Sequence, residues 1–237
     1  MQQRVEPHDS LDYFPTPPWA TRALCERLIL MSPLHLLTVW EPACGEGHMA
    51  KPLGEFFDKV IASDVHDYSA TYPAQDDVCD FLTPWDHPIQ FQDTPPNMPQ
   101  DGGADWIITN PPFRLGEKFI WTALKVARQG VAVLVRTAFL EGVGRHKSLF
   151  SVKPPSLILQ FTERVPMVKG RLDKGASSAT SYCWIVWEKN PGLTGMFEWV
   201  APCRKRLEKA RDYPAPPEEL PPIPLFDGGE NDPFPHN

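Results

Sequence analysis

Residues 105–113 read Asp-Trp-Ile-Ile-Thr-Asn-Pro-Pro-Phe, and this stretch decides the fold that we expect. The apolar run from Trp106 to Ile108 is typical of a short buried strand. Two prolines end the run at once, because proline has no N–H for strand pairing and its φ is fixed. Asn110 is therefore predicted at the carboxyl end of a strand, followed by a stiff turn. In an open α/β sheet, ligands bind at this edge.

The oxygen atoms of this turn indicate its chemistry. The side-chain amide oxygen of Asn110 and the main-chain carbonyl oxygen of Pro111 are both hydrogen-bond acceptors. Held rigidly by the prolines, they could accept the two hydrogens of a planar exocyclic amine, draw its nitrogen towards tetrahedral geometry and localise its lone pair. The ring of Phe113 could stack on the flat target. The stretch thus predicts a site that turns a poor nitrogen nucleophile into a good one.

A segment nearer the N-terminus has the features of a helix start beside a ligand. Tyr13-Phe-Pro-Thr-Pro-Pro-Trp19 precedes an apolar helical stripe that runs to about Met31. Thr16 is predicted as the N-cap, with Pro17 at the first helical position. A helix start with a free hydroxyl suits a carboxylate ligand, although a capped core helix would look the same.

Two further strands are each followed by a candidate binding group. The strand over residues 36–41 runs into Glu41-Pro-Ala-Cys-Gly45-Glu-Gly47, whose glycines allow a tight turn and close backbone approach to a ligand. A helix to about Phe57 follows. The next strand, residues 60–65, carries Asp64 about 20 residues beyond the glycines, where a carboxylate can accept both hydroxyls of a ribose. A third short strand is expected over residues 76–82.

These motifs, in this order, resemble the S-adenosylmethionine-dependent amino-methyltransferases over roughly residues 13–187. The likeness is greatest to the short phage- or prophage-type DNA adenine-N6 methyltransferases, whose catalytic motif is similar to Asn-Pro-Pro-Phe. It implies a Rossmann-like class I methyltransferase fold, an α/β fold whose seven-stranded, mostly parallel sheet has its last strand antiparallel. It also implies methyl transfer from S-adenosylmethionine to N6 of adenine in DNA, after the base has been flipped out of the duplex.

The resemblance assigns roles to individual residues. Glu41 would bond the cofactor ammonium group and Asp64 its ribose, while Asp80, or Asp77 as an alternative, would take its adenine amino group. The catalytic set is Asn110, Pro111, Pro112 and Phe113. The full set expected to bind S-adenosylmethionine is Thr16, Glu41, Pro42, Ala43, Cys44, Gly45, Gly47, Asp64, Asp80, Phe81, whose ring would pack on the adenine, and Asn110.

The charge distribution favours a nucleic-acid partner more than the net charge of −7 does. Residues 114–174 carry 12 Lys and Arg against 4 Asp and Glu, while the rest of the chain carries 11 against 26. Such a basic segment could meet a phosphate backbone, or it could be an ordinary solvated surface. His146 is not expected to act as a base, since the methylated amine can lose its proton to water. The candidate substrate contacts are Phe113, Arg136, Arg145, Lys147, Met167, Lys169, Arg171 and Lys174; Met167 stands where many relatives have an aromatic residue.

Several alternatives stay open at this point. The same chemistry could act on RNA adenine, on cytosine N4 or on a protein glutamine. The chain could also be a non-catalytic nucleic-acid-binding module on the same fold. Recognition of a target sequence would fall to the loops over residues 83–103 and 163–180. In the first of these, Trp85 and Phe91 could contact bases or belong to a loosely packed insertion.

Other properties bound the class of protein. The five cysteines include no Cys-x-x-Cys pair, so neither a metal site nor a disulfide scaffold is expected. The polar N-terminus does not read as a signal peptide, and no apolar run approaches the roughly 20 residues of a membrane span, so we expect a cytoplasmic protein. Residues 1–12 should be flexible, 13–188 should form the methyltransferase domain, and the proline-rich, acidic residues 189–237 should be partly extended or disordered, with a short helix over 203–211. The oligomeric state is left open.

Overall fold

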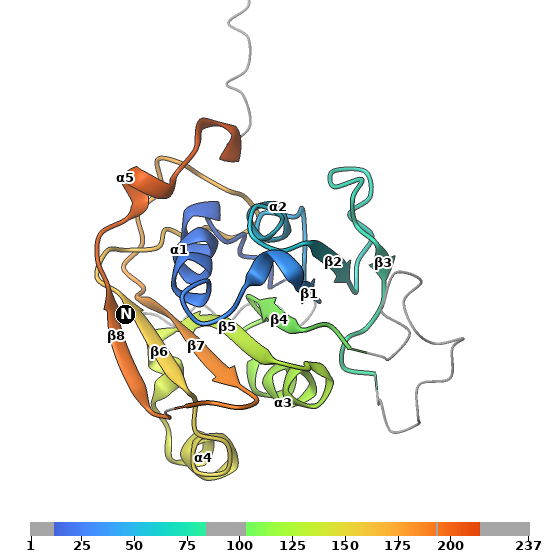
Figure 1. Ribbon diagram of the computed structural model, residues 1–237. Coiled ribbons are helices and arrows are strands. Elements are labelled where there is room, and N and C mark those ends of the chain that lie inside the picture. The colour runs from blue at the N-terminus through green and yellow to red at the C-terminus, as the bar shows by residue number, and fades with distance from the viewer. Residues whose placement is uncertain (1–11, 84–102, 193, 214–237) are drawn as a thin grey trace, which may run out of the picture.

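The computed structural model describes residues 12–83, 103–192 and 194–213. Trp85, Phe91 and most of the loop around them lie outside these ranges, as do residues 1–11 and 214–237. The described residues form one eight-stranded sheet in the order β3-β2-β1-β4-β5-β7-β6-β8 (Figure 1). Its strands are β1 Thr38–Glu41, β2 Lys59–Asp64, β3 Asp77–Val78, β4 Trp106–Thr109, β5 Gly130–Arg136, β6 Leu157–Phe161, β7 Tyr182–Glu188 and β8 Met196–Val200.

The strand directions confirm the expected fold class and correct two of its details. All strand pairs are parallel except those of β7, which runs antiparallel to both β5 and β6. The sheet has eight strands where seven are expected, and its last strand, β8, is parallel to β6. The expected antiparallel strand is therefore the one before the last.

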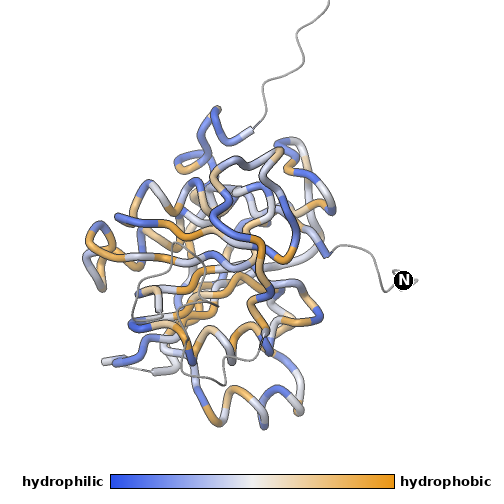
Figure 2. Tube along the Cα trace, turned by 90° about the vertical axis from the view of Figure 1, so that its right-hand side faces the viewer, coloured by the Kyte–Doolittle hydropathy of each residue, from blue (hydrophilic) through white to orange (hydrophobic). Residues whose placement is uncertain are grey.

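Helices cover both faces of the sheet, with α1 and α2 on one face and α3 on the other (Figure 1). The side chains of a strand alternate between the faces, so neighbouring residues enter different cores. Trp106 and Ile108 of β4 pack in the core beneath α1, whereas Ile107 packs in the core beneath α3. Apolar residues accordingly follow the central strands, and hydrophilic residues follow most outer loops (Figure 2). The helices are α1 Pro18–Leu28, α2 Ala50–Leu53, α3 Gly116–Val126, α4 Val143–Arg145 and α5 Arg204–Leu207, with the shorter turns η1 Leu34–Leu36, η2 Thr137–Leu140, η3 His146–Phe150 and η4 Ala210–Asp212.

The start of α1 differs from the expectation by one residue. The helix begins at Pro18, its N-cap is Pro17, and no side chain caps it. A residue that precedes proline is kept out of the helical region, and Pro17 indeed has ψ 127°. Thr16 therefore lies one position too early to act as the N-cap, and its buried side chain lines a cavity instead.

The chain beyond residue 188 extends the domain. Strand β8 adds to the sheet, and α5 packs on α1, with Cys203 and Leu207 in the core beneath α1. The expected short helix after residue 203 is confirmed but is only four residues long. All five cysteines are free thiols. No described helix combines the length and apolar character that a membrane span would need.

Candidate active site

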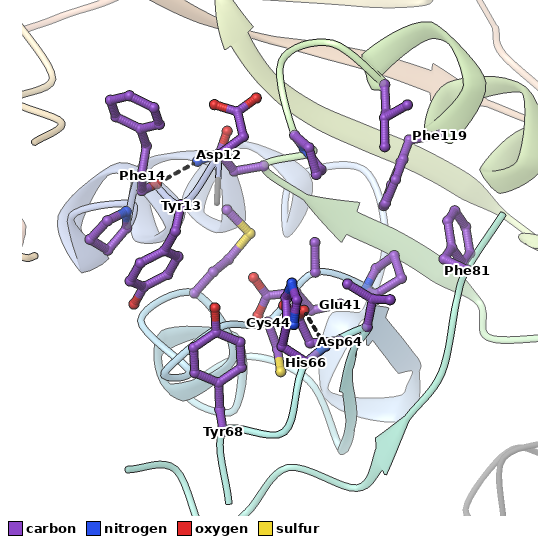
Figure 3. Close-up of a pocket in the computed structure, with 18 of the residues that line it drawn as sticks. Asp12, Tyr13, Phe14, Glu41, Cys44, Asp64, His66, Tyr68, Phe81 and Phe119 are labelled. Atoms are coloured by element: carbon purple, nitrogen blue, oxygen red, sulfur yellow. Dashed lines mark hydrogen bonds between the residues drawn. The ribbon is translucent and has the colours of Figure 1, made fainter. Parts of the chain in front are cut away.

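A cavity of about 280 Å³ opens at the carboxyl ends of β1, β2 and β4. Figure 3 shows Tyr13 and Phe14 on one side of it, Phe81 and Phe119 on the other, and Glu41 and Asp64 between them. Most of the predicted cofactor-binding residues line this cavity, although they come from five separate parts of the chain. They are Thr16, Glu41, Pro42, Ala43, Cys44, Asp64, Asp80, Phe81 and Asn110, and the catalytic candidate Pro112 joins them.

The two loop glycines shape the cavity without lining it. Gly45 and Gly47 have φ of +49° and +74°, values that side-chain-bearing residues rarely adopt. A Cβ atom on Gly45 would lie 2.5 Å from the ring of Tyr13, and one on Gly47 would lie 2.5 Å from the ring of Tyr72. These positions must therefore be glycine for the tyrosine rings to pack against the loop.

Asp64 is fixed at the end of β2 by two main-chain donors. The N–H of Gly45 donates to Oδ2 at 3.0 Å, and the N–H of His66 donates to Oδ1 at 3.1 Å. Each carboxylate oxygen can accept more than one hydrogen bond, so both retain acceptor capacity towards the cavity. This geometry suits the predicted contact with two neighbouring hydroxyl groups.

Glu41 presents an unsatisfied acceptor to the cavity. Its side chain is buried, and Oε2 has no hydrogen-bond partner within the described residues. Burial, reinforced by the charge of Asp64, raises the pKa of this carboxyl well above its usual range, although the N–H of Ala50 opposes the shift. A buried carboxylate with one unpartnered oxygen is costly, and a cationic ligand group would satisfy that oxygen.

Asn110 is held in one orientation by the segment that precedes α1. Its Nδ2 donates to the carbonyl oxygen of Phe14 at 2.9 Å, and Nδ2 also lies 3.8 Å from Sδ of Met167. With the nitrogen engaged in this way, Oδ1 remains a buried acceptor without a partner among the described residues. The end of β4 thus carries the fixed oxygen acceptor that the sequence predicts.

Phe113 lies beside the cavity in a small cluster of two aromatic rings and a cation. Its N–H donates to Oδ2 of Asp12 at 2.5 Å, and its ring lies 5.0 Å from the ring of Phe14. The guanidinium of Arg136, at the end of β5, sits 4.0 Å from the centre of the Phe113 ring. The sequence predicts Phe113 and Arg136 as substrate contacts, and in the structure these two side chains lie against each other.

Asp80 and Phe81 have different surroundings. Asp80 is exposed at the cavity, and its Oδ1 accepts the N–H of Leu82 at 2.8 Å. The ring of Phe81 is only 1% exposed and packs edge-on against Trp40, so it is also a core residue. The alternative, Asp77, does not line the cavity, and its Oδ1 accepts the N–H of Val78. The geometry favours Asp80.

The remaining predicted substrate contacts lie outside the cavity. Nη1 of Arg145 donates to the carbonyl oxygens of Phe139 and Glu141, so this guanidinium braces its own loop. Met167 is buried beside Asn110. The other four are exposed basic residues: Lys147, Lys169, Arg171, which pairs with Asp173, and Lys174.

No protein-family model and no curated protein matches the sequence of this chain. Solved structures match its fold. A putative RNA methyltransferase from Pyrococcus horikoshii superposes with a TM-score of 0.54 and 12% identity, over 79% of this chain and 92% of its own. The modification subunit of a putative type I restriction enzyme from Vibrio vulnificus YJ016 gives 0.52 and 15%, over 83% and 49%. The fold is that of the class I methyltransferases.

A type I restriction-modification methyltransferase subunit from Streptococcus thermophilus also matches, with a TM-score of 0.52 and 10% identity, over 78% of this chain and 46% of its own. The present chain therefore spans about half the length of the two restriction-system subunits. In the methyltransferase fold of this chain, the strand order reverses between β1 and β4. The cavity lies at the carboxyl ends of these two strands, where open α/β sheets bind ligands.

Several cavity residues are not singled out in the sequence, although Tyr13, Phe14 and Pro15 belong to the segment that is expected beside a ligand. Asp12 is expected in a flexible N-terminus, yet its carboxylate holds the N–H of Phe113. Phe14 acts through a main-chain carbonyl, for which no sequence pattern exists. The two consecutive aromatic residues Tyr13 and Phe14 are the one sequence signal for the contribution of this segment, which precedes α1. The others are Tyr13, Pro15, His48, Met49, Val65, His66, Tyr68, Cys79, Leu82, Leu115 and Phe119.

Proposed function

We propose that this chain transfers a methyl group from S-adenosylmethionine to the N6 amine of adenine in DNA. The observation that carries the proposal is the orientation of Asn110. Because its amide nitrogen is bonded to Phe14, its Oδ1 is left without a partner among the described residues and would serve as a fixed acceptor for an amine hydrogen. The carbonyl oxygen of Pro111 would accept the second hydrogen, and Phe113 would stack on the base.

The cavity fits S-adenosylmethionine, which when bound supplies an electrophilic sulfonium methyl group. The orphaned Oε2 of Glu41 would accept from the ammonium group of the cofactor. Asp64, held by two main-chain N–H groups, would accept from the ribose hydroxyls. Asp80 would accept from the adenine amino group, beside the edge of Phe81. Each ligand group would thus meet an acceptor of the matching kind at one end of the sheet.

Transfer to such an amine needs no protein base, since the methylated nitrogen gives up its proton to water. His146 is exposed on η3 and does not line the cavity. The chain must instead position the substrate. Two acceptors would make the amine nitrogen pyramidal, and an aromatic ring would hold the base beside the methyl donor. Preorganised groups of this kind accelerate a reaction because they need no rearrangement in the transition state.

DNA is favoured as the substrate by the type I restriction subunits among the matching structures and by the basic segment that follows Phe113. The same chemistry on RNA adenine is the second candidate, because a putative RNA methyltransferase shares the fold over 79% of this chain. Both substrates require an extruded or unpaired base, since the acceptors cannot reach an amine inside a stacked duplex.

A labelled-methyl transfer assay tests the proposal. Purified protein with labelled S-adenosylmethionine is offered DNA, RNA and protein in parallel, and the modified nucleoside is identified by mass spectrometry. We expect N6-methyladenine in DNA. Asn110→Ala should reduce the rate by about 10²- to 10³-fold, the usual effect of removing one preorganised group. Binding of S-adenosylhomocysteine, measured by calorimetry, should change little.

Asn110→Asp is an informative intermediate, because it keeps an acceptor oxygen and loses the N–H that Phe14 fixes; it should retain part of the activity. Asn190→Ala, at an exposed position after β7, is the matched control and should behave as wild type. An Asn110→Ala variant that transfers methyl groups at the wild-type rate would refute the mechanism, and label found in protein alone would refute the substrate.

A further inference from the structure

A second hollow, of about 560 Å³, lies along the same edge of the sheet, beyond Arg136. It is formed at the carboxyl ends of β5, β6 and β8 and at the amino end of β7. Side chains of Thr137, Thr162, Arg164, Ser181, Phe197 and Trp199 are among those that line it. None of these residues belongs to the cofactor cavity.

Strand β8 gives the hollow an aromatic wall. Its side chains alternate, so that Glu198 points towards α1 and bonds to Arg27, while Phe197 and Trp199 point to the other face. These two rings are 49% and 68% exposed, and their centres lie 5.0 Å apart at 81°. The two adjacent rings form one exposed apolar patch, and such patches, when rimmed by polar residues, are found at binding sites.

The polar groups of the hollow are largely engaged with one another. The hydroxyl of Thr137 donates to Gln160, whose amide nitrogen donates to two carbonyl oxygens, and the hydroxyl of Thr162 donates to Val200. The carboxylate of Glu163, which also lines the hollow, is engaged as well, because its Oε1 accepts the N–H groups of Cys203 and Arg204. What the hollow offers a ligand is therefore the two aromatic rings and the exposed guanidinium of Arg164, which is bonded to Ser181. Ring faces and a cation suit a stacked base and a phosphate, without hydrogen bonds that would read the base.

The hollow continues from the catalytic turn. Arg136 stacks on Phe113 and is hydrogen-bonded to Tyr182. The next residue, Thr137, donates its N–H to the carbonyl oxygen of Ser181 at 2.9 Å, and Ser181 in turn holds Arg164. A row of groups thus runs along the carboxyl ends of the parallel strands from Phe113 to β8. It consists of the guanidinium of Arg136, the hydroxyl of Ser181, the guanidinium of Arg164 and the two aromatic rings of β8.

We propose that this hollow binds the nucleotide next to the target base on the same DNA strand. Its base would stack on the more exposed ring, that of Trp199, which Phe197 contacts nearly at a right angle, and its phosphate would pair with Arg164. The inference rests on the proposed function and deepens it, because it states how a chain of this size grips its substrate outside the cofactor cavity. Contact through ring faces alone would make the grip tolerant of the flanking sequence.

Fluorescence anisotropy with a labelled single-stranded DNA of about 12 nucleotides, in the presence of S-adenosylhomocysteine, measures the grip directly. Trp199→Ala should weaken binding by about five- to hundredfold, the range that loss of one base-stacking ring produces. Trp199→Phe keeps a ring and should stay close to wild type. Leu36→Ala is the matched control. Leu36 is also exposed, at 69%, but it precedes β1 and so lies at the amino ends of the parallel strands, away from the hollow.

Two further readouts locate the contact. Arg164→Gln should make the slope of log affinity against log salt shallower by about one, as expected for one lost phosphate contact, whereas Lys153→Gln, ahead of β6, should not. A 5-iododeoxyuridine placed beside the adenine should cross-link to Trp199 in the wild type. Unfolding temperatures of the variants show whether each is folded.

The outcomes separate this inference from the function on which it rests. If the wild type methylates DNA but Trp199→Ala binds and turns over DNA as the wild type does, the inference is wrong and the function stands. If the wild type transfers no methyl group, but Trp199→Ala lowers the affinity for DNA and the cross-link to Trp199 forms, DNA binding in the hollow stands and the proposed reaction is wrong. A wild-type dimer that dissociates on Trp199→Ala, with DNA affinity unchanged, would make β8 an interface between copies and overturn the inference.

Discussion

At the scale of single residues, Glu41 shows how a binding group can be costly to the free protein. Its carboxyl is buried with one oxygen unpartnered, and burial together with Asp64 raises its pKa. A raised pKa in the folded state means that Glu41 stabilises the fold below the ordinary carboxyl pKa of about 4.3 and that this contribution is lost as pH rises towards the folded pKa. An ammonium ligand would reverse that loss by pairing with the charge.

We therefore expect Glu41→Gln to leave the free protein as stable as the wild type, or more stable, at neutral and alkaline pH. The variant should bind S-adenosylhomocysteine about tenfold to a hundredfold more weakly, because a hydrogen bond between charged groups is lost. The wild type should release protons on binding, since the ligand ionises Glu41. Calorimetry in buffers of different ionisation enthalpy measures this release.

Glu188→Gln is the matched control, a partly buried carboxyl of raised pKa at the opposite edge of the sheet. It should bind the ligand as the wild type does. If Glu41→Gln bound S-adenosylhomocysteine as tightly as the wild type does, the proposed contact between Glu41 and the ammonium group would be wrong.

The sequence predicts cavity residues that contribute a polar side chain and misses those that contribute a main-chain group. Glu41 and Asp64 end buried strands and Asn110 follows one, so a strand pattern with a polar residue at its end suffices to find them. Phe14 orients Asn110 through a carbonyl oxygen from 96 residues away, and no side-chain pattern records that contact. Phe81 illustrates another limit, because a ring that lines a cavity and a ring that fills a core look alike in sequence.

At the scale of elements, α1 is tied to the C-terminal part of the domain by a buried ion network. The guanidinium of Arg22 on α1 pairs with Glu55 at 2.8 Å and with Asp212 at 2.7 Å. Burial alone would raise the pKa of Glu55, but its hydrogen bonds with Arg22, Lys209 and Arg211 lower it to about 2. The network therefore stabilises the fold above the ordinary carboxyl pKa and is lost as pH falls towards 2.

Arg22→Met should destabilise the protein by about 3 kcal/mol at neutral pH, because it leaves the buried Asp212 carboxylate without its guanidinium. The loss of stability on acidification from about pH 4.5 to pH 2 should become shallower in this variant. Urea unfolding at several pH values measures both effects.

Arg27→Met is the control on the same helix, since the pair that Arg27 forms with Glu198 is more exposed and should contribute about 1 kcal/mol or less. Equal losses in the two variants would contradict a special role for the Arg22 network.

Element positions are predicted well where apolar runs are long and poorly where the chain turns polar. β1, β2 and β4 are found to within two residues, because each carries a buried apolar run. β8 is missed because it is an edge strand in which Phe197 and Trp199 stay exposed, so it carries no apolar run to mark it. The start of α1 is displaced because consecutive prolines at residues 17 and 18 both fit a first helical position.

At the scale of the whole molecule, the charge is divided between two functions. The net charge of −7 repels nucleic acid, while residues 114–174 carry 12 of the 23 Lys and Arg residues and only 4 of the 30 Asp and Glu residues. Phosphate binding by such groups releases counterions, so affinity should fall steeply with salt.

We expect log affinity for duplex DNA to fall with log salt at a slope of about −0.9 for each phosphate contact. Replacing Lys147, Lys169, Arg171 and Lys174 together by Gln should make this slope shallower by about three to four, with the binding of S-adenosylhomocysteine unchanged. Replacing Lys125 and Lys153 by Gln, near the amino ends of β5 and β6, should leave the slope alone. A salt-independent affinity would show that the basic segment is an ordinary solvated surface.

The proposed reaction depends most on which ligand the cavity binds and on how that ligand is oriented. A crystal structure with S-adenosylhomocysteine tests this directly. We predict its ammonium group at Glu41, its ribose at Asp64, its adenine at Asp80, and its sulfur facing the Oδ1 atom of Asn110. A ligand bound elsewhere, or a sulfur atom directed away from Asn110, would contradict it.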